Sequence, residues 1–157
     1  MTQMPNVQNQ TAYESLDGTT LQDVRDSFEL LDDWEDRYRY IIELGRKLPK
    51  LPQDAYNEAN KVRGCTSQVW LVATPEGPEH RLVLKGDSDA HIVKGLVALM
   101  LLIFSRKTPD DILKTDARAI LEELDLRQHL SPMRANGLFS MLERIEALAA
   151  SAKKQTA

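Results

Sequence analysis

The sequence predicts an α+β fold, because helical hydrophobic spacing occupies both ends of the chain and extended segments occupy its middle. Apolar residues recur every three or four positions before Pro49 and again after Ser88, as in helices that bury one face. Between them lie short apolar runs separated by turn residues, as in strands. Of the 157 residues 42% are hydrophobic, enough for the core of one domain. We expect a small sheet packed against about six helices.

The first two helices are predicted between Thr20 and Pro49. Thr20 is a suitable N-cap for a helix whose apolar positions are Leu21, Val24, Phe28 and Leu31. Asp33 begins a second helix, and the apolar stripe of this helix comprises Trp34, Tyr38, Ile41, Ile42 and Leu48. Gly45 lies on the same side, where a neighbouring element can approach closely. Pro49 and Pro52 end the helix.

The domain is expected to span residues 20–150. Residues 1–19 are rich in Gln, Asn and Thr and poor in large apolar side chains, so we expect a disordered N-terminal segment. Residues 151–157 are expected to fray.

Three strands are predicted in the middle of the chain, at residues 61–63, 69–73 and 81–85. The proline and glycine residues of 74–78 indicate a loop between the last two. A small three-stranded antiparallel sheet is the simplest arrangement, and it places Cys65 in the connection between the first two strands.

The C-terminal half is predicted to be helical. A helix at residues 89–105 is apolar nearly all round, so other elements should enclose it, and Ser88 with Asp87 and Asp89 forms its expected cap. A short helix follows Thr108-Pro109, and another begins at Asp116. Residues 127–130 form a link, after which Ser131-Pro132 starts a final long helix.

Composition argues against several classes of function. Lys and Arg number 20 against 24 Asp and Glu, and the charges are interspersed, so we expect neither a nucleic-acid partner nor an anionic membrane surface. The longest apolar run, residues 96–104, is far short of the roughly 20 residues that span a bilayer. The first nineteen residues do not resemble a signal or transit peptide, and we expect a cytoplasmic protein.

Cys65 is the only cysteine in the chain. It cannot form an intramolecular disulfide, a structural zinc site or an iron-sulfur cluster within this chain, so it is either a buried apolar side chain or a single reactive nucleophile. Its neighbours Gly64, Thr66, Ser67 and Gln68 are turn residues, which favours reactivity. No metal-ligand spacing and no glycine-rich phosphate loop is present.

Three chemistries of a lone thiol can be compared. A cysteine hydrolase needs a base, but His80, His91 and His129 are all distant from Cys65 in the sequence. A redox sensor usually needs a resolving cysteine, so this one would have to pair in trans. A sulfur carrier needs only one thiol. Lys61 and Arg63 are the nearby cations. They either lower the pKa of the Cys65 thiol or are ordinary solvated residues of a strand.

Several motifs closely resemble the SufE/CsdE family of cysteine desulfuration proteins. They are Gly64-Cys65-Thr66-Ser67-Gln68-Val69-Trp70, Gly86-Asp87-Ser88-Asp89-Ala90 and Ile92-Val93-Lys94-Gly95-Leu96. Residues 34–45 resemble the family's early helix, and His129-Leu130-Ser131-Pro132 with Arg134, Gly137 and Leu138 resembles its late one. The resemblance covers roughly residues 21–150 in the same order. The chain departs from the family in a longer N-terminal segment and in Thr66, where glutamine is also found.

The resemblance implies a fold similar to the IscU scaffold and a function in sulfur transfer. Cys65 would accept persulfide sulfur from a SufS/CsdA-type cysteine desulfurase, stimulate that enzyme, and pass the sulfur to a downstream scaffold protein for iron-sulfur cluster assembly. The protein itself would not be an enzyme, would hold no metal, and would need no cofactor, since pyridoxal phosphate belongs to the desulfurase. The Cys65 loop should tuck against apolar residues and swing out on docking.

The partner-contact residues expected around Cys65 are Gly64, Gln68, Asp89, Lys94 and Arg134. Asp89 and Arg134 also have ordinary roles open to them, in the first turns of their helices. Two functions remain open, a covalent sulfur carrier and a non-covalent adaptor or regulator of the desulfurase. The choice between the SufE and CsdE systems, the sulfur recipient, and the choice between monomer and homodimer are also open.

Overall fold

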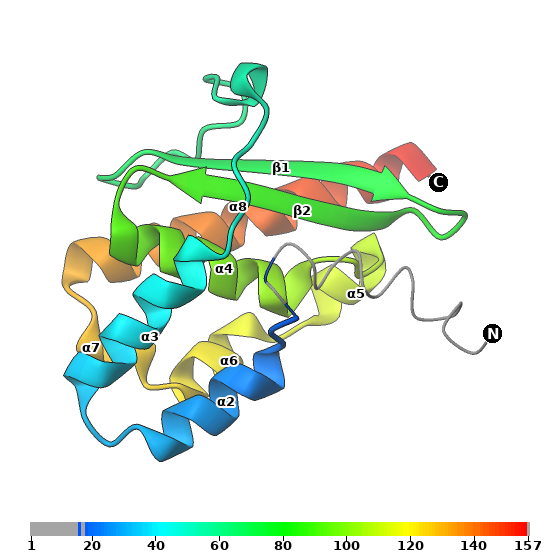
Figure 1. Cartoon of the computed structure of the whole chain (residues 1–157). Helices are drawn as coiled ribbons and strands as arrows, with labels where there is room; N and C mark the ends of the chain where they lie inside the picture. Colours follow the sequence, from blue (N-terminus) through cyan, green and yellow to red (C-terminus); the bar gives the residue numbers. More distant parts are fainter. Residues whose placement is uncertain (1–15, 17, 157) are drawn as a thin grey trace.

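The computed structural model describes Leu16 and residues 18–156, and these form an α+β fold (Figure 1). A two-stranded sheet lies over α4 and α8, and α2, α3, α6 and α7 lie on the side of α4 away from the sheet (Figure 1). The described residues contain seven α-helices and one 3-10 helix. In chain order the elements are α2 (Leu21–Leu30), α3 (Trp34–Arg46), η2 (Gln53–Ala55), β1 (Val69–Glu76), β2 (Arg81–Ser88), α4 (His91–Phe104), α5 (Pro109–Lys114), α6 (Ala117–Glu123), α7 (Leu126–His129) and α8 (Pro132–Thr156).

The expected third strand is not formed, so the sheet is an antiparallel pair of β1 and β2. Residues 61–63 contribute one isolated bridge, from Lys61 to Trp70. Around that bridge the Val62 N–H donates to the Val69 carbonyl at 2.8 Å. The extended run ends there because the chain turns at Gly64, whose φ of +88° is left-handed and incompatible with a strand. A second isolated bridge joins Leu82 to Lys107 at the opposite edge.

Strand β2 is longer than the expected 81–85 segment, and this changes the start of α4. Gly86, Asp87 and Ser88 continue the ladder and pair with Leu71, Trp70 and Val69. The helix therefore begins at His91 with Ala90 as its N-cap, and no side chain caps it. The expected capping role of Ser88, Asp87 and Asp89 is wrong, because strand pairing uses two of these residues and the third contacts Gln68.

The other predicted helix starts are confirmed. Thr20 forms a capping box with Asp23, and Asp33, Thr108 and Asp116 each accept a backbone N–H of the helix that they begin. The expected link at residues 127–130 is mostly the short helix α7. Helix α8 continues to Thr156, and the expected fraying of residues 151–157 stays a prediction. Most of the expected N-terminal disordered segment lies outside the described residues, although Leu16 is buried in the core.

Helix α4 is the centre of the hydrophobic core, as its apolar sequence predicts. Ten of its fourteen residues are buried, and it contacts α3, β2 and α8. Helices α3 and α4 cross at two glycines. A Cβ on Gly45 would lie 2.6 Å from the backbone nitrogen of Gly95, and a Cβ on Gly95 would overlap the backbone of Ile41. The close approach expected at Gly45 is therefore confirmed, with α4 as the neighbour.

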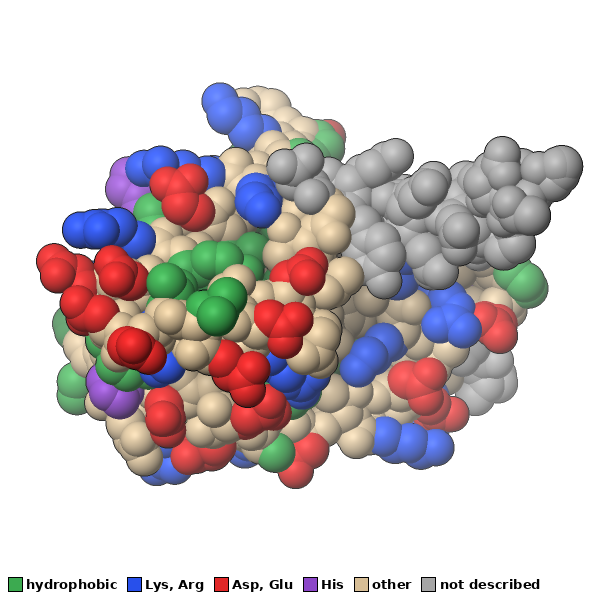
Figure 2. All heavy atoms as spheres, turned by 60° about the horizontal axis from the view of Figure 1, so that its bottom comes forward, with side chains coloured by type: hydrophobic (Ala, Val, Ile, Leu, Met, Phe, Trp, Pro, Cys, Tyr) green, Lys and Arg blue, Asp and Glu red, His purple; other side chains and the backbone are tan. Residues whose placement is uncertain are grey.

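Acidic side chains gather on the face that α2, α3 and α6 form, away from the sheet (Figure 2). Helices α2 and α3 contribute Asp23, Asp26, Glu29, Glu35, Asp36 and Glu43 to the acidic residues of the chain. Leu30, at the end of α2, is 82% exposed. Within residues 18–156, no helix is long and apolar enough to cross a membrane.

Replacing Gly45 by Ala should destabilise the protein, because the added methyl group meets the backbone of α4 and not a flexible side chain. We expect the free energy of unfolding in urea to fall by about 1–3 kcal/mol. Gly77→Asn is the control, since Gly77 has a φ of +75° and nothing within 4 Å of an added Cβ. Asn tolerates that conformation, so a loss as large as that of Gly45→Ala would contradict the crossing as the cause.

Candidate functional site

Cys65 lies in the turn that precedes β1, beside the first turns of α8, and its side chain is half-buried. The thiol Sγ lies 3.6 Å from the backbone carbonyl oxygen of Gly137 on α8, as a weak S–H donor would. A Cβ at position 137 would lie 3.5 Å from Sγ, at ordinary van der Waals distance, so the thiol packs directly against this part of α8. The thiol therefore faces α8 rather than open solvent.

The turn that carries Cys65 requires glycine at position 64. Gly64 has a φ of +88°, and a Cβ there would lie 2.5 Å from the Ser140 hydroxyl. The left-handed φ is strained for a residue with a side chain, and an added Cβ would also force the Ser140 hydroxyl to rotate away. The predicted site residue Gly64 thus brings the loop down onto α8.

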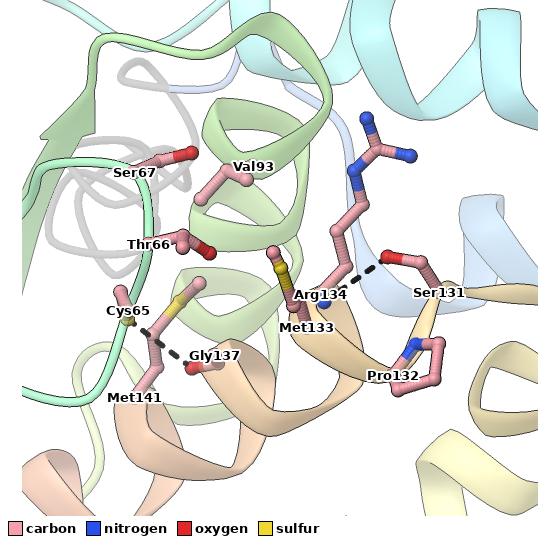
Figure 3. A pocket seen from close by; sticks show the side chains of 10 residues that line it. All are labelled: Cys65, Thr66, Ser67, Val93, Ser131, Pro132, Met133, Arg134, Gly137 and Met141. Carbon is pink, nitrogen blue, oxygen red and sulfur yellow. Dashed lines mark hydrogen bonds between the residues drawn. The ribbon is translucent and has the colours of Figure 1, made fainter.

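A cavity of about 550 Å³ opens beside the thiol (Figure 3). Thr66 and Ser67 supply hydroxyl groups from the loop, while α4 and α8 supply most of the apolar wall. The residues that line it are Cys65, Thr66, Ser67, Val93, Ser131, Pro132, Met133, Arg134, Gly137 and Met141. The polar neighbours of Cys65 in the sequence do not form an apolar pocket by themselves, and the fold provides one from distant helices.

Gln68 and Asp89 contact each other at the base of the loop. The Asp89 carboxylate accepts the Gln68 backbone N–H at 3.0 Å and the Gln68 side-chain amide at 3.4 Å. In return the Asp89 N–H donates to the Gln68 carbonyl at 3.3 Å. The pair lies one position beyond the last ladder pair, Val69 and Ser88, and it holds the end of the Cys65 loop. Two predicted site residues are thus brought together, with a local structural role.

Lys94 points into a partly buried polar cluster. Its Nζ lies 3.3 Å from Oδ1 of Asp87, a buried carboxylate whose other oxygen accepts the Tyr56 hydroxyl at 2.5 Å. The Tyr56 hydroxyl also accepts the Leu51 N–H, and its ring packs edge-on against Trp70. Burial and the hydrogen bond to Asp87 raise the pKa of the Tyr56 phenol. The cluster ties the segment before Cys65 to the outer face of the sheet.

Arg134 is exposed at the mouth of the cavity. Its backbone N–H donates to the Ser131 hydroxyl, which caps the start of α8. In the part of the chain that the structure describes, its guanidinium makes no hydrogen bond or ion pair. Met133 beside it is 57% exposed. The rim of the cavity therefore presents an unpaired cation next to an apolar side chain.

Burial raises the pKa of the Cys65 thiol. Lys61 and Arg63 do not offset this effect, because both contact the Glu58 carboxylate, at 3.8 Å and 3.6 Å. Arg63 is also highly exposed, which weakens its electrostatic effect on neighbours. The hypothesis that these two cations lower the thiol pKa is wrong for the recessed position of the loop.

The three histidines do not contribute to the cavity lining. The His129 ring stacks on Trp34 with centroids 4.0 Å apart, and its Nδ1 lies 3.0 Å from the Asp125 carbonyl. His91 is the first residue of α4, and His80 lies in the turn between the strands. Among the described residues, no group of three or more His, Cys, Asp or Glu side chains is placed to hold a metal ion.

Comparisons with known proteins agree with this architecture. Residues 22–149 match the family model SufE, described as an Fe-S metabolism associated domain. An uncharacterized SufE-like protein of Rhizobium meliloti (strain 1021) is 52% identical over 130 residues, which is 82% of this chain and 93% of that protein. One from Rhizobium etli is 49% identical over 134 residues, or 84% of this chain and 90% of that protein.

A solved structure supports the fold independently. The solution structure of a hypothetical protein from Thermus thermophilus superposes with a TM-score of 0.68, over 85% of this chain and 96% of that one. Its sequence identity is 23%, so this likeness concerns the fold alone.

Several residues around the thiol have contacts that the sequence did not predict. Gly137 belongs to the late motif, but nothing in the sequence placed its carbonyl beside Cys65. A glycine in the interior of a helix costs stability relative to alanine, and that was the one signal at this position, although an added Cβ would make only ordinary contact with Sγ. Val93, Met133 and Met141 carry no such signal, since they are ordinary apolar residues of helices.

Because burial raises the thiol pKa, alkylation of Cys65 by iodoacetamide should be slower in the folded protein than in the urea-unfolded chain at neutral pH. The reactive species is the thiolate, so the folded protein should show an apparent pKa above that of the unfolded chain. Rates measured by intact mass across a pH series give both values. The lone cysteine makes the assay unambiguous, and Cys65→Ser is the blank. An equal or lower pKa in the folded state would contradict a recessed thiol.

Proposed function

Because this chain belongs to the SufE family of Fe-S metabolism associated domains, we propose that it is a sulfur acceptor and carrier that uses Cys65 as its persulfide site. The sulfur comes from a SufS/CsdA-type cysteine desulfurase, whose turnover the protein stimulates. It then passes to a downstream acceptor for iron-sulfur cluster assembly. On this proposal the protein assists sulfur transfer and is not itself an enzyme.

One observation carries the proposal, namely the position of the only thiol in a turn at the edge of a partly apolar cavity. A persulfide is a labile group that reductants and other thiols attack. A cavity of about 550 Å³ beside Sγ has room for an added sulfur atom, and apolar side chains from α4 and α8 limit the access of water to it. The turn, in contrast, can be reached by another protein.

The transfer requires no oxidant, because it exchanges one sulfur-sulfur bond for another. The Cys65 thiolate attacks the terminal sulfur of the persulfide on the desulfurase, the bond to the enzyme's cysteine breaks, and that cysteine leaves as a thiolate. A second exchange of the same kind delivers the sulfur to the next thiolate. Neither step needs a metal or a cofactor on this chain, since cleavage of the carbon-sulfur bond belongs to the pyridoxal phosphate of the desulfurase.

The second candidate function is a non-covalent adaptor. The exposed side chains at the rim of the cavity favour it, because they are free to contact a partner. Arg134 and the exposed Met133 are available to a partner whether or not Cys65 accepts sulfur. The two functions share a docking surface and differ only in the covalent step.

Incubation with a cysteine desulfurase and cysteine, followed by intact-mass measurement, separates these functions. A carrier gains whole sulfur atoms that a reductant removes, and Cys65→Ser gains none. Cys65→Ser should keep its fold, because the side chain it replaces is only half-buried and its one hydrogen bond among the described residues is the weak bond to Gly137. Stimulation of the desulfurase without any gain in mass by the parent protein would favour the adaptor.

Arg134 should act in docking without contributing to stability. Among the described residues the Arg134 guanidinium makes no hydrogen bond or ion pair that Arg134→Ala would remove, so the free energy of unfolding should change by less than about 0.5 kcal/mol. Stimulation of the desulfurase should fall, mainly through weaker binding. Asp89→Asn is the comparison, because it also disturbs the contacts to Gln68 that hold the loop. Unchanged binding in Arg134→Ala would remove Arg134 from the interface.

A further inference from the structure

The segment before β1 is held at the sheet at two points, and the part between these points meets α8. On one side the Val62 N–H donates to the Val69 carbonyl at 2.8 Å. On the other side the Asp89 carboxylate accepts the Gln68 N–H at 3.0 Å. We call residues 63–67, which lie between these two points, the thiol loop. Exposure of the thiol requires this part of the chain to move away from α8.

Open space lies beside the thiol loop. The cavity of about 550 Å³ is lined by Cys65, Thr66 and Ser67 on one side and by helical residues on the other (Figure 3). A second cavity of about 250 Å³ is lined by the thiol loop and by Met133 and Asn136 of α8. The thiol loop and α8 are thus separated by space over part of their length, and the close contacts between them fix their distance.

Two residues of α8, one helical turn apart, contact the thiol loop, and they differ in how much space they leave. Cys65 faces Gly137, where an added Cβ would lie 3.5 Å from Sγ, an ordinary van der Waals distance. Gly64 faces Ser140, and a Cβ added to Gly64 would lie only 2.5 Å from the Ser140 Oγ and 3.4 Å from its Cβ. The contact between Gly64 and Ser140 is therefore the closer one, and it limits how near the loop comes to α8.

We propose that Ser140 is the positioning residue that sets how deeply Cys65 is recessed, because the thiol loop rests on its small side chain. A larger side chain at position 140 would fill the space that Gly64 occupies. Since the loop is held at both ends, it would have to move outward from α8. Ser140 does not touch the reacting sulfur and acts through the backbone at Gly64. The consequence for sulfur transfer, an easier exposure of the thiol, rests on the proposed function, whereas the recessed position does not.

Serine can give way at this contact more easily than a branched residue can. Its hydroxyl is a single atom on Cβ that can rotate to another staggered position. Isoleucine carries two carbon branches on Cβ and is nearly confined to one χ1 rotamer in a helix. Its extra bulk must therefore be accommodated largely by the thiol loop.

The experiment measures the rate of Cys65 alkylation by iodoacetamide in the full-length parent protein and in variants of position 140, with no desulfurase present. Ser140→Thr adds one methyl group and keeps the hydroxyl, while Ser140→Ile adds more bulk. Displacement of the loop should raise the rate about threefold or more in Ser140→Ile, with Ser140→Thr in between. The apparent thiol pKa should fall towards its ordinary value, because a thiolate outside the cavity is better solvated.

Ser140→Ala separates the bulk of the side chain from its hydrogen bonding. If the hydroxyl held the loop down through a hydrogen bond, its removal would free the loop and accelerate alkylation. If the bulk of the side chain limits the approach of the loop, Ser140→Ala should react no faster than the parent protein. No acceleration in Ser140→Ile, or a faster rate in Ser140→Ala than in Ser140→Thr, overturns the proposal. Should Ser140→Ile not fold, the milder Ser140→Thr decides by the same criterion.

Ser151→Ile is the matched control for a general loosening of α8. Ser151 is an exposed serine nearer the C-terminal end of the same helix, and it lines neither cavity beside the thiol loop. The substitution is the same as at position 140. Its alkylation rate should equal that of the parent protein, and thermal unfolding reports the stability of each variant. Equal acceleration in Ser151→Ile and Ser140→Ile would overturn the proposal.

The assay keeps this proposal distinct from the proposed function, because no desulfurase takes part. A protein that takes up no sulfur from a desulfurase can still show the dependence on side-chain size at position 140. A protein that takes up sulfur can equally fail to show it.

Discussion

The enclosure of α4 is the constraint on which the rest of the structure depends. A helix that is apolar nearly all round must be covered on every side, and here α3, β2 and α8 cover it. Gly45 and Gly95 let α3 approach until the two backbones touch, and Gly86 on β2 lies against Val97 of α4. The positions of the sheet and of α8 follow from this packing. The space between the start of β1 and the first turns of α8 is where Cys65 lies.

Burial links the exposure of Cys65 to its ionisation. In the recessed position burial raises the thiol pKa, and the two nearby cations contact Glu58. A thiol that leaves the cavity regains water, so its thiolate fraction at neutral pH increases. Any partner that draws the loop out would thus uncover the nucleophile and activate it in one movement. The chain has no need of a catalytic base for this, and none of its histidines lines the cavity.

The sequence predicted those features that depend on local pattern. Helix caps such as Thr20 and Thr108 follow from short-range side-chain geometry, and the enclosure of α4 follows from its composition. It also singled out Cys65 and Gly64. The predictions that proved wrong concern residues for which two local structures compete. Asp87 and Ser88 are good capping residues, but their backbones pair with β1, and this pairing outweighs the cap. Residues 61–63 have an extended pattern, but the turn at Gly64 stops them after one bridge.

The contacts of the site residues were harder to predict, because they join segments that lie far apart in the chain. The Asp87 carboxylate bonds Tyr56 and Lys94, and the Arg144 guanidinium reaches a carbonyl 85 residues away. None of these residues has a distinctive spacing, so only the folded structure brings them together.

The contacts of Cys65 indicate which part of the molecule yields when the thiol is exposed. Up to Val62 the chain is bonded to β1 through its backbone, and Asp89 holds Gln68 at the other end of the loop. Both ends therefore stay with the sheet. Gly64 and Cys65 contact α8 only through a close packing contact and a weak thiol bond. Moving the loop away from α8 therefore breaks weaker contacts than moving it away from the sheet would. The loop should therefore open as a flap hinged on β1, carrying Cys65 outward from α8, while the cavity wall that α4 and α8 provide stays in place.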